Sequence, residues 1–307
     1  PPRSTLFPYT TLFRSARVAP LFRYGTPFIA VSIGQFIINS ADRFFLQRYT
    51  DLTQVGIYSL GYRLGFTVNF LVLTPFLLLW ETKLFAIEKQ ANARVLYGRI
   101  LTYLALSLVF VAVALTVFSH EILVAMTTPA YYAASTIVPL VALAYVMNGL
   151  HEFFRLGMLI KSKTSIVGMM MFVQCAISVG AFALFIRAWG ARGAAFATVF
   201  SYGSLFVANY LLSQHFYSIP VESRRLGRIG VTASVVVIIQ SLLPELSFMQ
   251  ALVIKSGLLL LFPIVLIASG FLNEWEKLAL QDIGQQLQRN RKRVRKYSSD
   301  VRKFFSR

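Results

Sequence analysis

Ionisable and amide side chains inside apolar segments are the residues of this chain whose types and spacing could do chemistry. Asn39, Asp42 and Arg43 close one apolar segment, and Arg63 and Asn69 lie within the next. Arg63 is about nine residues inside its segment, or ~13 Å deep at a rise of 1.5 Å per residue. A charge near the bilayer centre costs ~2.5–3.5 kcal/mol, so it must face protein or water. These residues therefore predict a hydrated polar site.

A second polar stripe lies further along the chain. Asn148, Glu152 and Arg155 recur at i, i+4 and i+7, which places them on one face of a helix. Arginine offers a positive charge and a forked donor that match the oxygens of phosphate. A net-basic cavity among the helices would therefore suit an anionic head group. The side chains expected to bind substrate are the arginines and amides of the two stripes, Arg63, Asn39, Asn69, Asn148 and Arg155.

The remaining charged members of the stripes, Asp42, Arg43 and Glu152, are expected to form a gate or ion pairs. Two plainer interpretations stay open. Asp42 with Arg43 could simply close a helix end at the membrane surface, and Glu152 with Arg155 could be an i, i+3 pair on one helix. Lys255, near the outer end of the last apolar segment, is expected to extend its ammonium group toward the membrane surface.

The elements that must position these residues are long apolar helices. A hydrocarbon layer ~30 Å thick needs about 18 or more apolar residues per helix, and a helix satisfies its own backbone hydrogen bonds in lipid. The fold class expected is all-α transmembrane, with one six-helix lobe and two additional helices. The eight expected spans are 24–41, 54–80, 100–119, 133–150, 164–186, 193–214, 229–243 and 248–273.

The basic residues predict the orientation of these spans. With a cytoplasmic N-terminus, 24 of the 30 lysines and arginines fall in the cytoplasmic segments and four fall in the external loops. Cytoplasmic loops of membrane proteins carry this excess of positive charge. We therefore expect a multi-pass membrane protein with both termini in the cytoplasm.

Composition divides the chain and excludes several functions. Residues 1–15 match nothing else in the sequence and resemble a translated adaptor, so the expected organisation is a six-helix lobe at 16–215, two further helices at 216–273 and a cytoplasmic interfacial helix with a basic tail at 274–307. The net charge is +18, and ten of the 30 basic residues lie in that tail, which favours anionic lipids as partners over nucleic acid.

Catalysis is not indicated by the sequence. One cysteine, three histidines and 12 acidic residues provide no metal cluster, disulfide framework or catalytic set, and no glycine-rich phosphate loop is present. We therefore expect no enzyme activity, no cofactor and no bound metal. A membrane transporter fits the apolar segments and their buried charges better than a membrane enzyme does.

Two short motifs carry a resemblance to a known family. The stretches Ser-Ala-Asp-Arg-Phe-Phe-Leu and Val-Gly-Ile-Tyr-Ser-Leu-Gly-Tyr-Arg-Leu, which contain Asp42, Arg43 and Arg63, resemble the C-terminal lobe of O-antigen-type polysaccharide flippases. These flippases belong to the multidrug/oligosaccharidyl-lipid/polysaccharide exporter superfamily. The likeness extends over about 20–215. Family members have two six-helix lobes, so the resemblance implies that an N-terminal lobe precedes this chain as its partner.

The resemblance implies transfer of an undecaprenyl-diphosphate-linked oligosaccharide across the bacterial cytoplasmic membrane by alternating access, in the synthesis of surface polysaccharide such as lipopolysaccharide. Asp42, Arg43 and Arg63 occupy motif positions of the family, and our hypothesis is that Arg63 contacts the diphosphate and that Asp42 with Arg43 forms an outer gate. Two alternatives remain open: a drug or cation antiporter of the same superfamily, and a membrane glycosyltransferase or polymerase. The antiporter would require a carboxylate deep in the membrane, and the enzyme would require a catalytic acid and an extended external loop.

Overall fold

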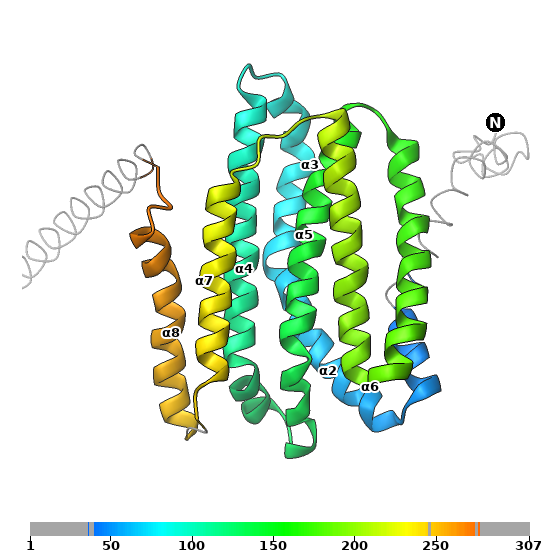
Figure 1. The fold of residues 1–307 in the computed structure, drawn as a ribbon, viewed down its shortest axis with the longest axis vertical. Coiled ribbons are helices and arrows are strands. Elements are labelled where there is room, and N and C mark those ends of the chain that lie inside the picture. The colour runs from blue at the N-terminus through cyan, green and yellow to red at the C-terminus, as the bar shows by residue number, and fades with distance from the viewer. Residues whose placement is uncertain (1–35, 37–39, 245–246, 274–275, 277–307) are drawn as a thin grey trace, which may run out of the picture. The chain divides into compact units, whose positions relative to one another are not determined.

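The computed structural model describes residues 36, 40–244, 247–273 and 276 of the 307-residue chain (Figure 1). Within these ranges every regular element is a helix, and several helices are long and apolar enough to cross a membrane. The expected all-α transmembrane fold is therefore confirmed. The chain forms two compact units, 1–259 and 260–307, and the boundary falls inside the last described helix. The first predicted span and the basic tail lie largely outside the described residues.

The elements in chain order are α2 (Leu52–Val68), the π-helical segment η2 (Asn69–Leu73), α3 (Thr74–Glu88), α4 (Ala93–Met126), the 3-10 helix η3 (Pro129–Thr136), α5 (Val138–Ile160), α6 (Thr164–Phe216), α7 (Ser223–Ser241) and α8 (Phe248–Ala268). A helical segment at 40–49 precedes α2. In the first unit, α5 contacts α2, α4 and α6, and α7 lies along α4 (Figure 1).

Helix α6 is a hairpin of two antiparallel arms. The chain reverses at Gly190, whose φ of 55° and ψ of −132° lie in a region that glycine adopts without steric cost. The hydroxyl groups of Ser178 and Ser201, which are nearly equidistant from the turn, form a hydrogen bond between the arms. Figure 1 shows the two arms side by side. The predicted spans 164–186 and 193–214 are these two arms.

By length and hydropathy, four of the described helices can cross a membrane, or five if η3 and α5, which meet at a bend of 42°, form one span. The expected number was eight. Three facts account for the difference. Span 24–41 lies largely outside the described residues, and the two arms of α6 count as one helix. The three arginines in the first turns of α7 make that helix too polar to be counted. At ~1.5 Å per residue, each α6 arm is still long enough to cross a ~30 Å hydrocarbon layer.

The connections between helices alternate between two ends of this unit. Residues 89–92, 161–163 and 217–222 lie at one end, at the top of Figure 1, and residues 127–137 lie at the other with Gly190. The first end is the more basic, with Lys83, Lys89, Lys161 and Lys163 exposed there. The structure therefore has the alternation that the charge pattern predicts, while the side of the membrane that each end faces remains a prediction.

Helix α2 approaches α5 closely because glycine occupies the contact. A Cβ atom on Gly65 would lie 2.6 Å from the Cβ of Val141, and one on Gly61 would lie 2.7 Å from the Cβ of Ile137. Replacing Gly65 with alanine is therefore expected to lower the free energy of unfolding by about 1–3 kcal/mol, the usual cost of overpacking. Denaturant unfolding of the purified protein in detergent measures this change.

Gly180 provides the matched control for this substitution. A Cβ atom there meets nothing within 4 Å, so alanine at Gly180 adds no clash. Because alanine forms helix better than glycine, the control is expected to leave stability unchanged or to raise it by up to ~1 kcal/mol. Equal losses of stability in the two variants would contradict the close contact between α2 and α5.

Candidate functional site

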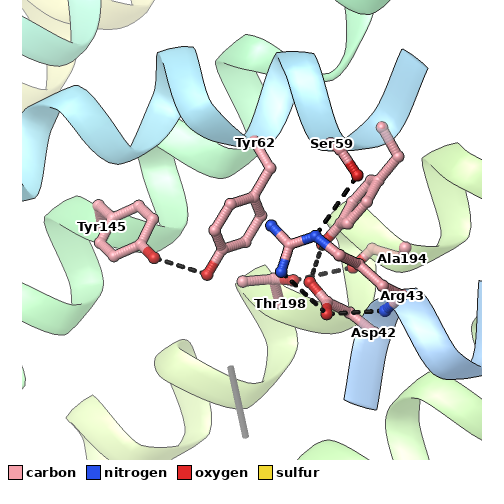
Figure 2. A network of polar contacts seen from close by, with 8 residues as sticks. Asp42, Arg43, Ser59, Tyr62, Tyr145, Ala194 and Thr198 are labelled. Carbon is pink, nitrogen blue, oxygen red and sulfur yellow. Dashed lines mark hydrogen bonds and ion pairs between the residues drawn. The ribbon is translucent and has the colours of Figure 1, made fainter. Parts of the chain in front are cut away.

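A buried carboxylate is the centre of a polar network at one end of α2. Asp42 is 1% exposed, and the Tyr58 hydroxyl donates a hydrogen bond to its Oδ2 at 2.8 Å. The backbone N–H of Arg43 donates to Oδ1 at 2.7 Å, and the Arg43 Nη1 lies 3.8 Å from the same oxygen (Figure 2). Burial of a carboxylate is tolerated when donors of this kind surround it. Asp42 and Arg43 are therefore a local ion pair, with the acidic member inside the protein.

Arg43 extends this network toward α5. Its Nε donates to the Ser59 hydroxyl at 3.4 Å, and its guanidinium lies over the Tyr62 ring at 5.0 Å from the centroid. The hydroxyls of Tyr62 and Tyr145 are 2.6 Å apart and point toward each other in Figure 2. Segment 40–49, α2 and α5 are thus joined by one continuous set of polar contacts. The predicted gate residues belong to this set.

A small cavity lies beside this network. Asp42, Tyr62 and Tyr202 line it together with three hydroxyl groups from the two arms of α6, those of Ser178, Thr198 and Ser201. The cavity has room for about one water molecule, and buried waters usually make about three hydrogen bonds. The arrangement can therefore hold a water against a buried carboxylate and a tyrosine hydroxyl.

A second polar cluster lies nearer the opposite end of α5. The Arg155 Nη2 is 3.0 Å from the Glu152 Oε2, so the predicted i, i+3 ion pair is present. The His151 Nε2 lies 3.7 Å from the other oxygen of Glu152. These residues line a cavity of about 190 Å³ between α5 and the two arms of α6, to which Gln174 and Asn209 also contribute.

The other predicted substrate-binding residues are placed differently. Arg63 is exposed on the face of α2 opposite Gly61 and Gly65, and it lines neither cavity. Asn69, in η2, and Asn148, in α5, are partly buried, and Asn39 lies outside the described residues. In the part of the chain that the structure describes, the predicted residues therefore do not share one net-basic cavity. The cavities at Asp42 and at Glu152 are separate, and Arg63 is exposed.

The position of Lys255 differs from the expectation that its ammonium group extends toward the membrane surface. It is buried at 7% exposure, and its Nζ lies 2.7 Å from the Oε1 of Glu121, which is itself 5% exposed. The ammonium group therefore points into the protein and not toward the membrane surface. An acidic partner attracts the charge more strongly than a distant interface does, because both groups have lost water. Sequence reasoning missed Glu121 altogether.

Sequence reasoning also left His151, Gln174 and Asn209 out of the expected site. Gln174 and Asn209 are 9% and 1% exposed on apolar helices. The signal that could have found them in the sequence is the presence of amide side chains within apolar segments. Among the described residues, no group of three His, Cys, Asp or Glu side chains is arranged as a metal site would need.

Comparison with known proteins gives one match. Residues 4–78 match the model of a family described as polysaccharide biosynthesis protein. This range covers about a quarter of the chain and begins within residues 1–15. It includes Asp42, Arg43 and Arg63. Neither the curated proteins nor the solved structures gave a match. The segment that carries the Asp42 network is thus similar to polysaccharide biosynthesis proteins, which supports a role in the biosynthesis or transport of polysaccharide.

Proposed function

We propose that this chain takes part in moving an undecaprenyl-diphosphate-linked oligosaccharide from the cytoplasmic to the periplasmic leaflet of a bacterial membrane by alternating access. The observation that supports it most is the family match over residues 4–78, which coincides with the helices that contain Asp42, Arg43 and Arg63. The apolar helices supply the membrane location, and the polar groups among them supply contacts for a hydrophilic cargo. Transport is the proposed activity, not catalysis.

The exposed position of Arg63 supports a role at a surface that faces water or another protein lobe. A guanidinium on a membrane helix is costly in lipid, and it becomes tolerable beside an aqueous cavity. Its forked donors match the oxygens of a diphosphate. We therefore assign the diphosphate contact to Arg63, with Asn39 and Asn69 as further residues proposed to bind the cargo. Arg155 lines the separate cavity between α5 and α6, and Asn148 lies about two turns before it on α5.

An apolar groove along α4 supports a lipid cargo. Two hollows of about 400 and 460 Å³ follow α4 from Ile100 to Ala125, and Leu71 lines both. The second is bounded by Phe248 and Leu252 of α8, and apart from Glu121 its lining is apolar. Twenty-five residues of helix span ~38 Å, about the thickness of a bilayer. We place the prenyl chain of the cargo in this groove.

A vesicle assay tests the function. The full-length protein is reconstituted with a fluorescent undecaprenyl-diphosphate-linked oligosaccharide, and a membrane-impermeant quencher measures how fast the label changes leaflets. Wild-type protein is expected to exchange the label, whereas Arg63→Ala is expected to slow exchange at least about tenfold, as loss of a charge-assisted contact would. Arg48→Ala, which removes an exposed arginine at the outer end of the lobe, is the matched control. Absence of exchange with wild-type protein would refute the proposal.

A second candidate function, drug or cation antiport, has one observation in its favour. The Asp42 carboxylate is almost fully buried and lines a polar cavity, although a carboxylate at the end of a membrane helix was expected to be superficial. Vesicles loaded with ethidium under an imposed proton or sodium gradient distinguish the two functions. Gradient-driven ethidium movement without lipid exchange would favour the antiporter.

A further inference from the structure

The cavity between α5 and the two arms of α6 has the size of a small ligand. Its volume of about 190 Å³ is far larger than that of the one-water cavity beside Asp42, so it has room for a molecule the size of a sugar ring. It lies toward the basic end of the lobe, where the 161–163 connection joins α5 to α6. Its walls come from three consecutive helical segments that pack together, α5 and the two arms of α6.

Polar atoms at this cavity lack partners. His151 is 8% exposed and lines the cavity, and its Nδ1 has no hydrogen-bond partner among the described residues. The Arg155 Nε also has no hydrogen-bond partner among the described residues. The Glu152 Oε2 has its ion-pair contact with Arg155 and no other partner there. Buried polar atoms are nearly always hydrogen-bonded in native proteins. A bound polar molecule is therefore expected to complete these contacts.

The charge of the cavity favours a neutral ligand. The Glu152 carboxylate lies 3.0 Å from the Arg155 guanidinium, so the two formal charges offset each other. A phosphate would meet the carboxylate, and a metal cation would meet the guanidinium. The unpaired atoms include a donor, an acceptor and an imidazole nitrogen that can serve as either. Hydroxyl groups, which both donate and accept, match this set.

The remaining walls are apolar. Met170, Met171 and Leu205 line the cavity beside the two amides of Gln174 and Asn209. A sugar ring presents C–H groups on its faces and hydroxyl groups at its edge, so it can use both kinds of wall. We infer that this cavity binds a single sugar residue of the saccharide cargo. The inference rests on the proposed function, because the glycolipid cargo is what would bring a sugar residue to this cavity.

Direct binding of free sugars tests this site. Full-length protein in nanodiscs is titrated with glucose, galactose, rhamnose and N-acetylglucosamine, and saturation-transfer NMR reports contact and Kd. At least one of these sugars is expected to bind. Gln174→Met keeps the side-chain length but removes the amide, and it is expected to raise the Kd about tenfold by leaving the ligand's hydroxyls unpaired. Gln240→Met makes the same change on α7, away from the cavity, and is expected to leave the Kd unchanged.

Two further measurements complete the test. Should Gln174→Met fail to fold, Met171→Phe takes its place, because it fills the cavity without removing a polar group and is also expected to raise the Kd. Inorganic phosphate is expected not to compete with the bound sugar. Absence of binding by all four sugars, an equal Kd in the Gln174→Met and Gln240→Met variants, or displacement of the sugar by phosphate would each overturn the site.

The two proposals fail in different experiments. Leaflet exchange by wild-type protein in vesicles, with no sugar binding, would leave the transport function standing and remove the sugar site. Sugar binding in nanodiscs with no leaflet exchange would retain the site as a saccharide-binding cavity and remove the transport function.

Discussion

Lys255→Met is expected to lower the free energy of unfolding by about 3–5 kcal/mol, the cost of leaving a buried carboxylate without its partner. The Lys255 Nζ lies 2.7 Å from Glu121 on α4, and both side chains are less than a tenth exposed. The Oε2 of Glu121 already lacks a hydrogen-bond partner among the described residues. Thermal and denaturant unfolding in detergent measure the loss.

A double variant separates the buried charge from the other effects of substitution. Glu121→Met with Lys255→Met removes both charges, and replacing a buried ion pair with apolar groups is often neutral or stabilising. The double variant is therefore expected to recover most of the stability that Lys255→Met loses. Lys161→Met, at an exposed position, is expected to change stability by less than about 0.5 kcal/mol. A double variant no more stable than Lys255→Met would argue against a pairwise contact.

Asp42→Ala is expected to abolish most leaflet exchange in the vesicle assay, by about tenfold or more, and to lower the free energy of unfolding by about 1–3 kcal/mol. The carboxylate accepts hydrogen bonds from the Tyr58 hydroxyl and the Arg43 backbone and pairs with the Arg43 guanidinium. Its removal takes away the carboxylate acceptor of a fully buried tyrosine hydroxyl and the charge that pairs with Arg43, which connects the network to Tyr62.

A second substitution tests whether the buried hydroxyl that has lost its carboxylate acceptor causes the loss of stability. Tyr58→Phe in the Asp42→Ala background removes this hydroxyl, so part of the stability should return while exchange stays low. Asp51→Ala is the matched control. Asp51 is exposed and caps α2 by accepting from the Gln54 N–H, so its loss should cost about 1 kcal/mol of stability without slowing exchange. Normal exchange in the stable Asp42→Ala/Tyr58→Phe variant would exclude Asp42 from the gate.

Pairs that are close in sequence were predictable. Asp42 with Arg43 and Glu152 with Arg155 were expected as ion pairs, and the structure contains both. Helix geometry brings Glu152 and Arg155 together because they are i and i+3. Asp42 and Arg43 are neighbours in the chain, so their contact also needs no knowledge of the fold. By contrast, the contact between Tyr62 and Tyr145 could not be predicted in this way, because it forms only when α2 packs on α5.

The position of Arg63 shows where local reasoning failed. Its depth along the helix was taken as evidence for a cavity inside the lobe, but depth does not say which face of α2 packs inward. Gly61 and Gly65 decide that face, because only glycine admits Ile137 and Val141 at this distance. Arg63 is on the opposite side and is exposed. The glycine pair was present in the sequence and could have indicated this outcome.

The sequence by itself determined that the chain is a set of apolar helices with basic connections at one end, because lipid demands long apolar segments and internal backbone hydrogen bonds. Only the tertiary structure decided which charges are buried together. Lys255 and Glu121 are 134 residues apart, and the cavity at Glu152 joins α5 to both arms of α6. Such contacts depend on which helices are neighbours in the fold and on which faces they pack. Hydropathy and charge patterns do not measure either.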